Sequence, residues 1–310
     1  MVAGRFRSRA WRSRDDTRLM QALARTRLEV DWPAIRFHPG DLDWWVVQAH
    51  GRVPGVAGGV RLWFGPGHEL AAFGWFSPPA DLDFLVGSIE SGATATLVGE
   101  MIAWADRCRS AGADASTEPL RAWVAVGDEP GMGALRALGL VVEARPGFVQ
   151  FTGELSLTDR WPPPRLAPGL ALRILASDAD IEARVACGRA AFPGSTMTPE
   201  RYRTVRESWL YRDDLDLQIV AADGAVVAFA LGWFDEASGV VELEPVGVRP
   251  DWHRRGLGGE ICRAVLRVAR GLGAERATIA AERRNDAALG LYANLGLSIT
   301  AEIISVARPR

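Results

Sequence analysis

The chain has 310 residues, of which 48% are apolar and 24% charged, and its formal net charge is −2. This length predicts two domains of ordinary size, and the near-neutral charge excludes a protein that binds nucleic acid through bulk positive charge. No apolar run is long enough to span a membrane. Cys108, Cys187 and Cys262 are too far apart for a disulfide framework, and the four histidines show no metal-ligand spacing. We therefore expect a cytoplasmic protein with free thiols, no metal, no membrane contact and no nucleic-acid partner.

The first half of the chain begins with a basic segment and continues as a mixed α/β pattern. Five arginines within residues 1–14 indicate a solvated tail, and a domain is predicted over residues 15–158. Within this domain the apolar periodicity predicts helices at 15–28, 94–109 and 131–138, and strands at 43–49, 60–64, 70–76, 82–86, 120–126 and 148–155.

Three successive prolines mark a boundary, because they cannot sit in a helix or a central strand. We expect a linker at 159–168 and a second domain at 169–310. Its pattern predicts strands at 170–175, 215–222, 225–234, 241–248, 276–281 and 298–306, and helices at 177–191, from 198 onward, at 260–272 and at 286–294.

One stretch of the second half, from Glu242 to Gly259, carries the strongest functional signal. A strand-like segment ends at Pro250, a turn rich in glycine and arginine follows, and a helical pattern begins at Glu260. Backbone N–H groups at the start of a helix bind phosphate, because they lack partners and the helix dipole favours an anion there. A dinucleotide loop is excluded because Ile261 stands where glycine is needed, and a nucleotide P-loop is excluded because the chain has no lysine.

The segment His253-Arg-Arg-Gly-Leu-Gly258 resembles the acetyl-CoA loop of the GCN5-related N-acetyltransferases, the GNAT superfamily, with histidine where glutamine or arginine is usual. A second segment, Asn285–Leu297, resembles the family helix N-x-x-A-x-x-L-Y-x-x-x-G-F. The resemblance implies acetyl-CoA as co-substrate and an α/β (α+β) fold of two tandem GNAT-like domains, each a mixed twisted sheet flanked by helices. The tandem layout is similar to that of the mycothiol synthases. The implied acetyl-CoA contacts are Val246, Gly247, Val248, His253, Arg254, Arg255, Gly256, Leu257, Gly258, Gly259 and Asn285.

The two halves repeat one order of elements, and Leu138-Gly-Leu140 matches Leu295-Gly-Leu297. The first half nevertheless lacks the loop, because residues 87–93 contain no arginine and no Gly-x-Gly. Leu135 also falls opposite Tyr292. We therefore interpret the first half as a degenerate copy and expect one functional site per chain, in the second half.

Acetyl transfer to an amine requires a base, a donor to the oxyanion and an acid for the departing thiolate. Side chains alternate along a strand, so Glu242 and Glu244 share one face, and a carboxylate in a partly dry cleft has the raised pKa of a useful base. The resemblance implies Glu242 as the base, with Glu244 as its rival and a solvated or arginine-paired carboxylate as the alternative. It also implies that the N–H of Val246 polarises the thioester. Tyr292 would protonate the thiolate, unless it is only a packed core residue.

The acceptor is expected to contact Phe192, Trp209 and Tyr211, which precede the predicted hairpin at 215–234, where enzymes of this family usually shape the acceptor site. The sequence thus predicts an N-acetyltransferase that acts on a primary amine of a small molecule. Two alternatives stay open, a non-catalytic acyl-CoA-binding or regulatory module and a mycothiol-synthase-like enzyme. The acceptor, the acyl-chain preference and the oligomeric state are not determined by the sequence.

Overall fold

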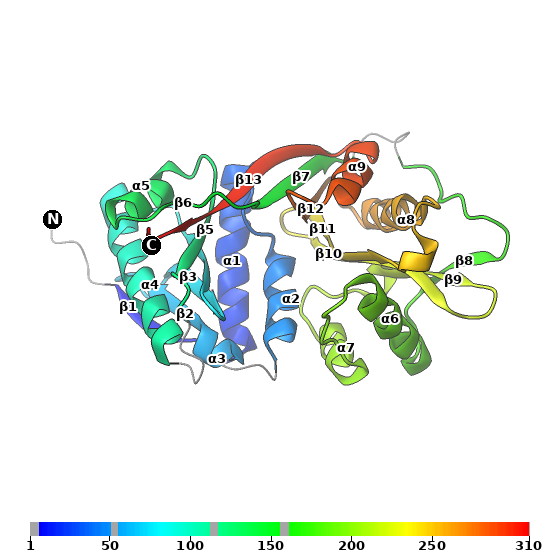
Figure 1. The fold of residues 1–310 in the computed structure, drawn as a ribbon, viewed down its shortest axis with the longest axis horizontal. Helices are drawn as coiled ribbons and strands as arrows, with labels where there is room; N and C mark the ends of the chain where they lie inside the picture. Colours follow the sequence, from blue (N-terminus) through cyan, green and yellow to red (C-terminus); the bar gives the residue numbers. More distant parts are fainter. Residues whose placement is uncertain (1–5, 51–54, 112–116, 156–160, 310) are drawn as a thin grey trace.

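A computed structural model describes residues 6–50, 55–111, 117–155 and 161–309 of the chain. The strands form one mixed sheet in the order β1-β2-β3-β4-β5-β13-β7-β12-β11-β10-β9-β8, and β6 pairs with β13 beside this path. Helices flank the sheet along its whole length (Figure 1). The predicted α/β class of mixed, helix-flanked sheets is confirmed, and the sheet runs without interruption through both halves of the chain.

The first half of the chain forms one end of this sheet. Its first strand, β1 (Arg7–Ala10), pairs antiparallel with β2, so residues 7–10 are not the solvated tail that the arginine content predicts. An ion pair of 2.6 Å between Arg9 and Asp16 helps to hold this strand in place. The other elements are α1 (Arg14–Asp31), α2 (Pro39–Ala49), α3 (Gly55–Gly59), β2 (Val60–Phe64), β3 (Leu70–Ser77), β4 (Asp81–Val86), α4 (Ser91–Ala111), β5 (Arg121–Ala125), α5 (Glu129–Ala137), β6 (Val141–Val142) and β7 (Phe148–Glu154).

Helix α2 replaces the strand that was predicted at 43–49, and that prediction is wrong. His38 accepts a hydrogen bond from the backbone N–H of Gly40, and the carboxylate of Asp41 accepts one from the backbone N–H of His38. Pro39 occupies the first turn, where its missing N–H costs nothing. These reciprocal caps favour a helix over the strand propensity of the tryptophans and valines that follow.

The second half continues the sheet and carries its own helices. The strands and helices of this half are β8 (Leu170–Ile174), α6 (Asp178–Ala191), α7 (Pro199–Arg206), β9 (Asp216–Ala221), β10 (Val226–Asp235), β11 (Val240–Val248), α8 (Leu257–Gly271), β12 (Arg276–Glu282), α9 (Asp286–Asn294) and β13 (Ser298–Ala307). Short 3-10 turns lie at Asp213–Leu215 and Pro250–Trp252. Before β8, residues 161–167 of the predicted linker form neither helix nor strand, while residues 159–160 lie outside the described part of the chain.

Two strands are exchanged between the halves. Strand β7, the last of the first half, lies between β12 and β13, and β13 continues past β7 to pair with β5. Figure 1 shows both strands crossing from one half to the other. The boundaries predicted at 158 and 169 therefore divide the sequence but do not divide the sheet. Alternating side chains identify a strand and its buried face, but they do not identify its partner.

Helix α2 connects the first half to the core of the second half. Trp44 and Val47 pack in one apolar cluster with Val185 of α6, Tyr202 of α7 and Trp233 of β10. Trp44 is also tilted against Trp233, with 6.5 Å between the ring centroids. The start of α2 is thereby held next to β11, so residues of the first half can contribute to a site on that strand. None of the described helices has both the length and the apolar content that crossing a membrane requires.

Candidate functional site

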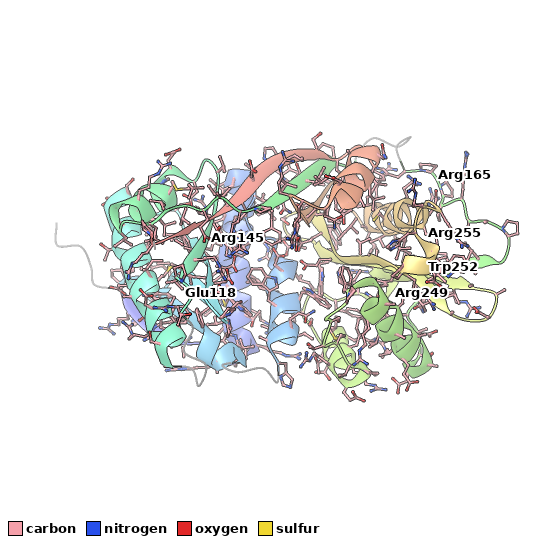
Figure 2. The ribbon with its side chains drawn as sticks, in the orientation of Figure 1. Glu118, Arg145, Arg165, Arg249, Trp252 and Arg255 are labelled. Carbon is pink, nitrogen blue, oxygen red and sulfur yellow. The ribbon has the colours of Figure 1, made fainter. Side chains whose placement is uncertain are left out.

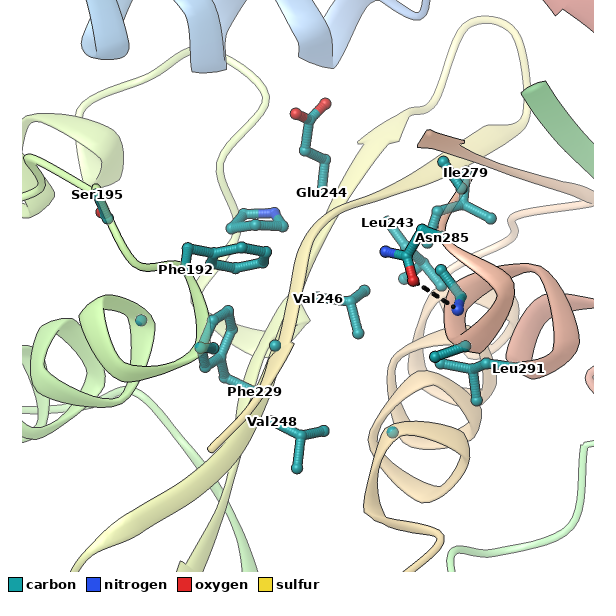
Figure 3. Close-up of a pocket in the computed structure, with 18 of the residues that line it drawn as sticks. Phe192, Ser195, Phe229, Leu243, Glu244, Val246, Val248, Ile279, Asn285 and Leu291 are labelled. Atoms are coloured by element: carbon teal, nitrogen blue, oxygen red, sulfur yellow. Dashed lines mark hydrogen bonds between the residues drawn. The ribbon is translucent and has the colours of Figure 1, made fainter. Parts of the chain in front are cut away.

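The divergence of β11 from β12 opens the main cavity of the second half. The two strands are paired in parallel only from Val240 to Glu242, whereas β11 stays paired with β10 as far as Val248. The space has a volume of about 1220 Å³ and is lined by the end of β11, the first turn of α8 and one side of α9. Figure 3 shows Val246 and Val248 of β11 facing Asn285 and Leu291 across the gap, while Glu244 extends from the same strand in a different direction.

The start of α8 provides backbone donors at one end of this cavity. Gly256 occupies the N-cap position with φ +78°, a conformation that favours glycine, and it supplies no side-chain cap. The N–H groups of the first turn therefore have no side-chain acceptor, and Gly258 leaves them uncovered on the cavity wall. This geometry suits a phosphate or pyrophosphate group.

Most of the predicted acetyl-CoA contacts lie on the cavity wall. The exception is Arg255, whose guanidinium stacks on Trp252 at 4.4 Å and donates to the backbone carbonyl of Asp251 (Figure 2). Asn285 caps α9, because its side-chain oxygen accepts from the N–H of Ala288 at 3.2 Å. The predicted contacts that line the cavity are Val246, Gly247, Val248, His253, Arg254, Gly256, Leu257, Gly258, Gly259 and Asn285.

The two candidate bases differ in their access to the cavity. Glu244 is half-buried and lines the cavity, whereas Glu242 has only 2% of its surface exposed and does not line it. Burial, followed by the nearby charge of Asp41, raises the pKa of Glu244 well above its ordinary value. The geometry therefore favours Glu244 over Glu242, reversing the order that the family resemblance implies.

The surroundings of Glu242 indicate a neutral carboxylic acid. Its Oε2 lies 3.3 Å from Nδ1 of His38, and this Nδ1 already accepts the N–H of Gly40. The other ring nitrogen, Nε2, lies 3.2 Å from the carbonyl of Val240, to which it can only donate. The imidazole is thus neutral and gives Glu242 no positive charge to balance an ionised carboxylate. Burial lowers the pKa of His38, and burial together with the charge of Asp41 raises the pKa of Glu242, in agreement with this assignment.

We expect Glu242→Gln to make the protein more stable than the wild type at pH 8, with a smaller difference at pH 5. The folded pKa of Glu242 lies above the unfolded one, so the folded state keeps a proton that the unfolded state has lost. Wild-type stability then falls as pH rises between these two values, by up to about 1.4 kcal/mol per pH unit. Glutamine is neutral at both pH values and avoids this cost. Urea unfolding at both pH values measures the effect, with exposed Glu236→Gln as control, and equal pH slopes for all three proteins would contradict it.

Tyr292 lies on the opposite side of the cavity from β11. It is 7% exposed, and its ring meets Phe151 edge to face with centroids 5.5 Å apart. Burial raises the pKa of its phenol well above the ordinary value, so the hydroxyl keeps its proton. The residue therefore combines core packing of the ring with a proton donor at the cavity, and both predicted interpretations apply to it.

The three residues that were predicted to contact the acceptor lie in different parts of the structure. Phe192 lines the cavity, at the end of α6 (Figure 3). Trp209 is 64% exposed and stacks under the guanidinium of Arg18, and the hydroxyl of Tyr211 donates to Asp216 at 3.0 Å. Neither of the latter two lines the cavity, so the structure does not bring them together with Phe192.

Several residues on the same wall were missed by the sequence analysis. Trp44 and Gln48 reach the cavity from α2, in the first half of the chain. Met197 and Tyr202 reach it from the region of α7. Asp41, at the start of α2, completes a cluster with Glu242 and Glu244 in which carboxylate oxygens lie within 4.8 Å of one another. The sequence pointed to the start of α2 through Pro39 and, two residues later, the acidic Asp41, a pattern typical of the first turn of a helix.

The profile of the acetyltransferase (GNAT) family matches residues 188–297, which include β9 to α9 and all of the cavity's glycine loop. These residues are a GNAT domain. The mycothiol acetyltransferase of Saccharomonospora viridis is 32% identical over 189 residues, which are 57% of this chain and 60% of that protein. The chain thus matches less than two thirds of the length of this relative.

Solved structures extend the comparison to the whole chain. A GCN5-related N-acetyltransferase from Sphaerobacter thermophilus has a TM-score of 0.66 at 20% identity, and the match covers 98% of this chain and 96% of that one. A tandem GNAT protein from the clavulanic acid biosynthesis pathway has a TM-score of 0.66 at 12% identity, covering 97% and 98%. The predicted family and the tandem fold are confirmed. The GNAT domain in the second half contains the glycine loop, and the first half shares the fold.

Proposed function

We propose that this protein transfers an acetyl group from acetyl-CoA to a primary amine of a small molecule. The observation that carries the proposal is the opening of β11 away from β12, which leaves Glu244 and Tyr292 on the walls of one cavity together with the uncapped start of α8. In a GNAT domain this arrangement supplies a base, an acid and a phosphate site for one reaction. We further infer a cytoplasmic protein, because all three cysteines are free.

The acetyl-CoA end of the cavity is the start of α8. Its backbone N–H groups would bind the pyrophosphate, and Gly258 would let the phosphates approach the backbone because it has no side chain. There is little room for one, since an added Cβ would meet the side chain of Leu291 at 3.1 Å. The pantetheine arm would then run along the stretch of β11 that is no longer paired with β12. A backbone N–H of this stretch, for which Val246 remains our candidate, would polarise the thioester carbonyl.

Transfer would proceed by direct attack. Glu244 takes a proton from the ammonium form of the acceptor, and the freed nitrogen lone pair attacks the carbonyl carbon of the thioester. The resulting oxyanion collapses, the C–S bond breaks, and Tyr292 donates its proton to the departing thiolate. The acylated nitrogen, which still carries one proton too many, releases it to solvent. The products are an N-acetyl amine and free CoA. The phenolate regains its proton from solvent, and Glu244 releases the one that it received.

The acceptor end of the cavity is the space between β11, α2 and α6. Trp44, Phe192 and Met197 give it apolar walls, and Glu244 gives it a carboxylate. These walls favour an amine with an apolar or aromatic body. A second candidate activity is the one that names the mycothiol acetyltransferase relative, and the identity of 32% to that protein favours it.

The test is a calorimetric titration of the whole chain with acetyl-CoA, followed by a search for turnover. We expect one binding site per chain. A panel of alkyl, arylalkyl and amino-sugar primary amines, together with the acceptor of mycothiol acetyltransferase, is then screened for release of free CoA thiol. Binding without turnover on the whole panel would favour a non-catalytic acyl-CoA module, and absence of binding would overturn the proposal.

Tyr292→Phe is expected to lower kcat by about 10²-fold, because general acid catalysis contributes at least that much to typical reactions. The phenyl ring keeps its edge-to-face contact with Phe151, so the fold and the cavity should be preserved. The Kd for acetyl-CoA should therefore stay within about twofold of the wild-type value. Assays of CoA thiol release measure kcat, and calorimetry measures the Kd for acetyl-CoA. A large loss of acetyl-CoA affinity with kcat unchanged would show that Tyr292 has a structural role only.

A further inference from the structure

Three carboxylates lie together beside the acceptor side of the cavity, and of these Glu244 lines it. Asp41, Glu242 and Glu244 have oxygens within 4.8 Å of one another, and in the part of the chain that the structure describes no arginine lies within ion-pair distance of them. The Oε2 of Glu242 is buried and has no hydrogen-bond partner. Glu242 is buried, and Asp41 and Glu244 are half-buried. Like charges this close repel one another, so ionisation of all three without a cation is unfavourable.

The hydrogen bonds of the cluster indicate where its protons lie. Asp41 accepts the backbone N–H of His38 at 2.8 Å, an interaction that favours its charged form. Glu242 is buried and faces the neutral imidazole of His38, which gives it no positive charge, so its protonated form is favoured. Oxygens of Glu244 and Asp41 lie within 4.8 Å of one another, and two carboxylates this close disfavour a state in which both are ionised. We therefore assign one shared proton to Asp41 and Glu244.

The other charged groups around the pair do not replace this proton. On the side of α2 they are His38, which is neutral, and Arg36, which is paired with Asp83. On β10 there is Asp235, which is paired with Arg25 at 2.6 Å. Two further groups are Glu242 on β11 and Tyr292 on α9, and both keep their protons. Burial raises the pKa of Asp41, and burial with the charge of Asp41 raises that of Glu244, so a proton is retained toward neutral pH.

We propose that Asp41, from the first half of the chain, is a positioning residue of the transfer site, which holds Glu244 and shares with it the proton that the acceptor ammonium gives up. This inference rests on the proposed function. The ammonium N–H proton passes to an oxygen of Glu244, the protonated Glu244 donates to Asp41, and the amine lone pair is freed for attack. The pair later releases this proton to solvent through the cavity. The base is thus a carboxylate pair built from both halves of the chain.

The same arrangement defines how the acceptor binds. With the shared proton lost to solvent, the pair carries two negative charges, and the ammonium ion of the acceptor balances one of them. The acceptor therefore enters as a cation rather than as a free amine. A neutral isostere, in which a hydroxyl replaces the amine of a substrate, should bind much more weakly to the wild type and lose this disadvantage in a variant without the pair.

Asp41→Asn tests the proposal, with Asp43→Asn as the matched control. Asp43 lies on the same helix and is buried, but it accepts from the backbone N–H of Leu210, away from the cavity. In Asp41→Asn the negative charge next to Glu244 is lost, and the pKa of Glu244 falls. The acid limb of the pH profile of kcat/KM should move to lower pH by about one unit or more, and the plateau should drop about tenfold because the base is weaker. Asp43→Asn should leave the position of the limb unchanged.

A second measurement needs no acceptor. Infrared spectra of the whole chain, titrated with pH, should show the carbonyl stretch of a protonated carboxylic acid that disappears in Glu244→Gln. In Asp41→Asn this band should titrate at lower pH than in the wild type. The proposal is overturned if the band keeps its midpoint in Asp41→Asn, or if the variant loses rate with an unmoved acid limb. Failure of every amine in the panel would instead count against the proposed function, and the infrared titration would still decide whether Asp41 and Glu244 share a proton.

Discussion

Replacing Glu244 by glutamine should lower kcat for amine acetylation by about 10²–10⁴-fold, the usual contribution of a positioned base. Glutamine has nearly the same volume and keeps hydrogen-bonding capacity toward Asp41, but it cannot accept a proton from the acceptor. The Kd for acetyl-CoA should change little, because Glu244 lies on the α2 side of the cavity and the glycine loop begins beyond Val248 (Figure 3).

The dependence of kcat/KM on pH provides a second test of Glu244 as the base. The pKa of Glu244 is raised above its ordinary value, so in the wild type kcat/KM should rise with pH as the carboxyl loses its proton, well above the range of an exposed glutamate. Glu244→Gln should remove this limb. Exposed Glu236, which pairs with Arg212 at 2.9 Å away from the cavity, provides the control variant Glu236→Gln with unchanged kinetics. If Glu242→Gln abolished the limb while Glu244→Gln kept it, Glu242 would be the base.

Gly258→Asp should raise the Kd for acetyl-CoA by at least about 100-fold, which corresponds to about 2.8 kcal/mol. Gly258 is the second residue of α8, and its backbone lies on the cavity wall where the proposal places the pyrophosphate. A carboxylate at this position would occupy the anion site and repel the phosphates. Calorimetry measures the loss directly, and an unchanged Kd would contradict the loop assignment.

Two further variants separate charge from volume. Gly258→Ala adds a Cβ that meets only the methyl groups of Leu291 and Val248, at 3.1 and 3.6 Å, so a modest loss of affinity is expected. Gly92→Asp places the same carboxylate at the second residue of α4, in the first half of the chain, where an added Cβ meets nothing within 4 Å. This control should leave acetyl-CoA binding intact, although it also puts an acid in the first turn of a helix.

The sequence alone was sufficient to predict those features that depend on neighbouring residues. The glycines of 256–259 expose the backbone at the start of a helix whatever surrounds them, and the apolar period after Glu260 defines that helix. The Thr198 and Ser177 caps of α7 and α6 also follow from side chains one turn apart, and both are observed. For these elements the interacting atoms lie within a few residues of one another, so the pattern contains the whole interaction.

The choice between the two glutamates required the tertiary structure. Alternation along β11 correctly predicts that Glu242 and Glu244 share a face, and both belong to the carboxylate cluster. Access to the cavity depends instead on where β11 separates from β12, and that point lies just after Glu242. Separation of neighbouring strands depends on packing between distant segments, which no local pattern records.

By itself, the sequence predicted the family, the glycine loop and most of the helical and strand segments, because each of these signals lies in residues close together in the chain. Only the tertiary structure decided that β7 and β13 exchange between halves, and that α2 brings Asp41 next to Glu244. Strand partners and contacts between halves are set by burial of surfaces more than one hundred residues apart, and a strand or helix pattern is compatible with many such partners. For this reason the contribution of the first half to the site was visible only in the folded chain.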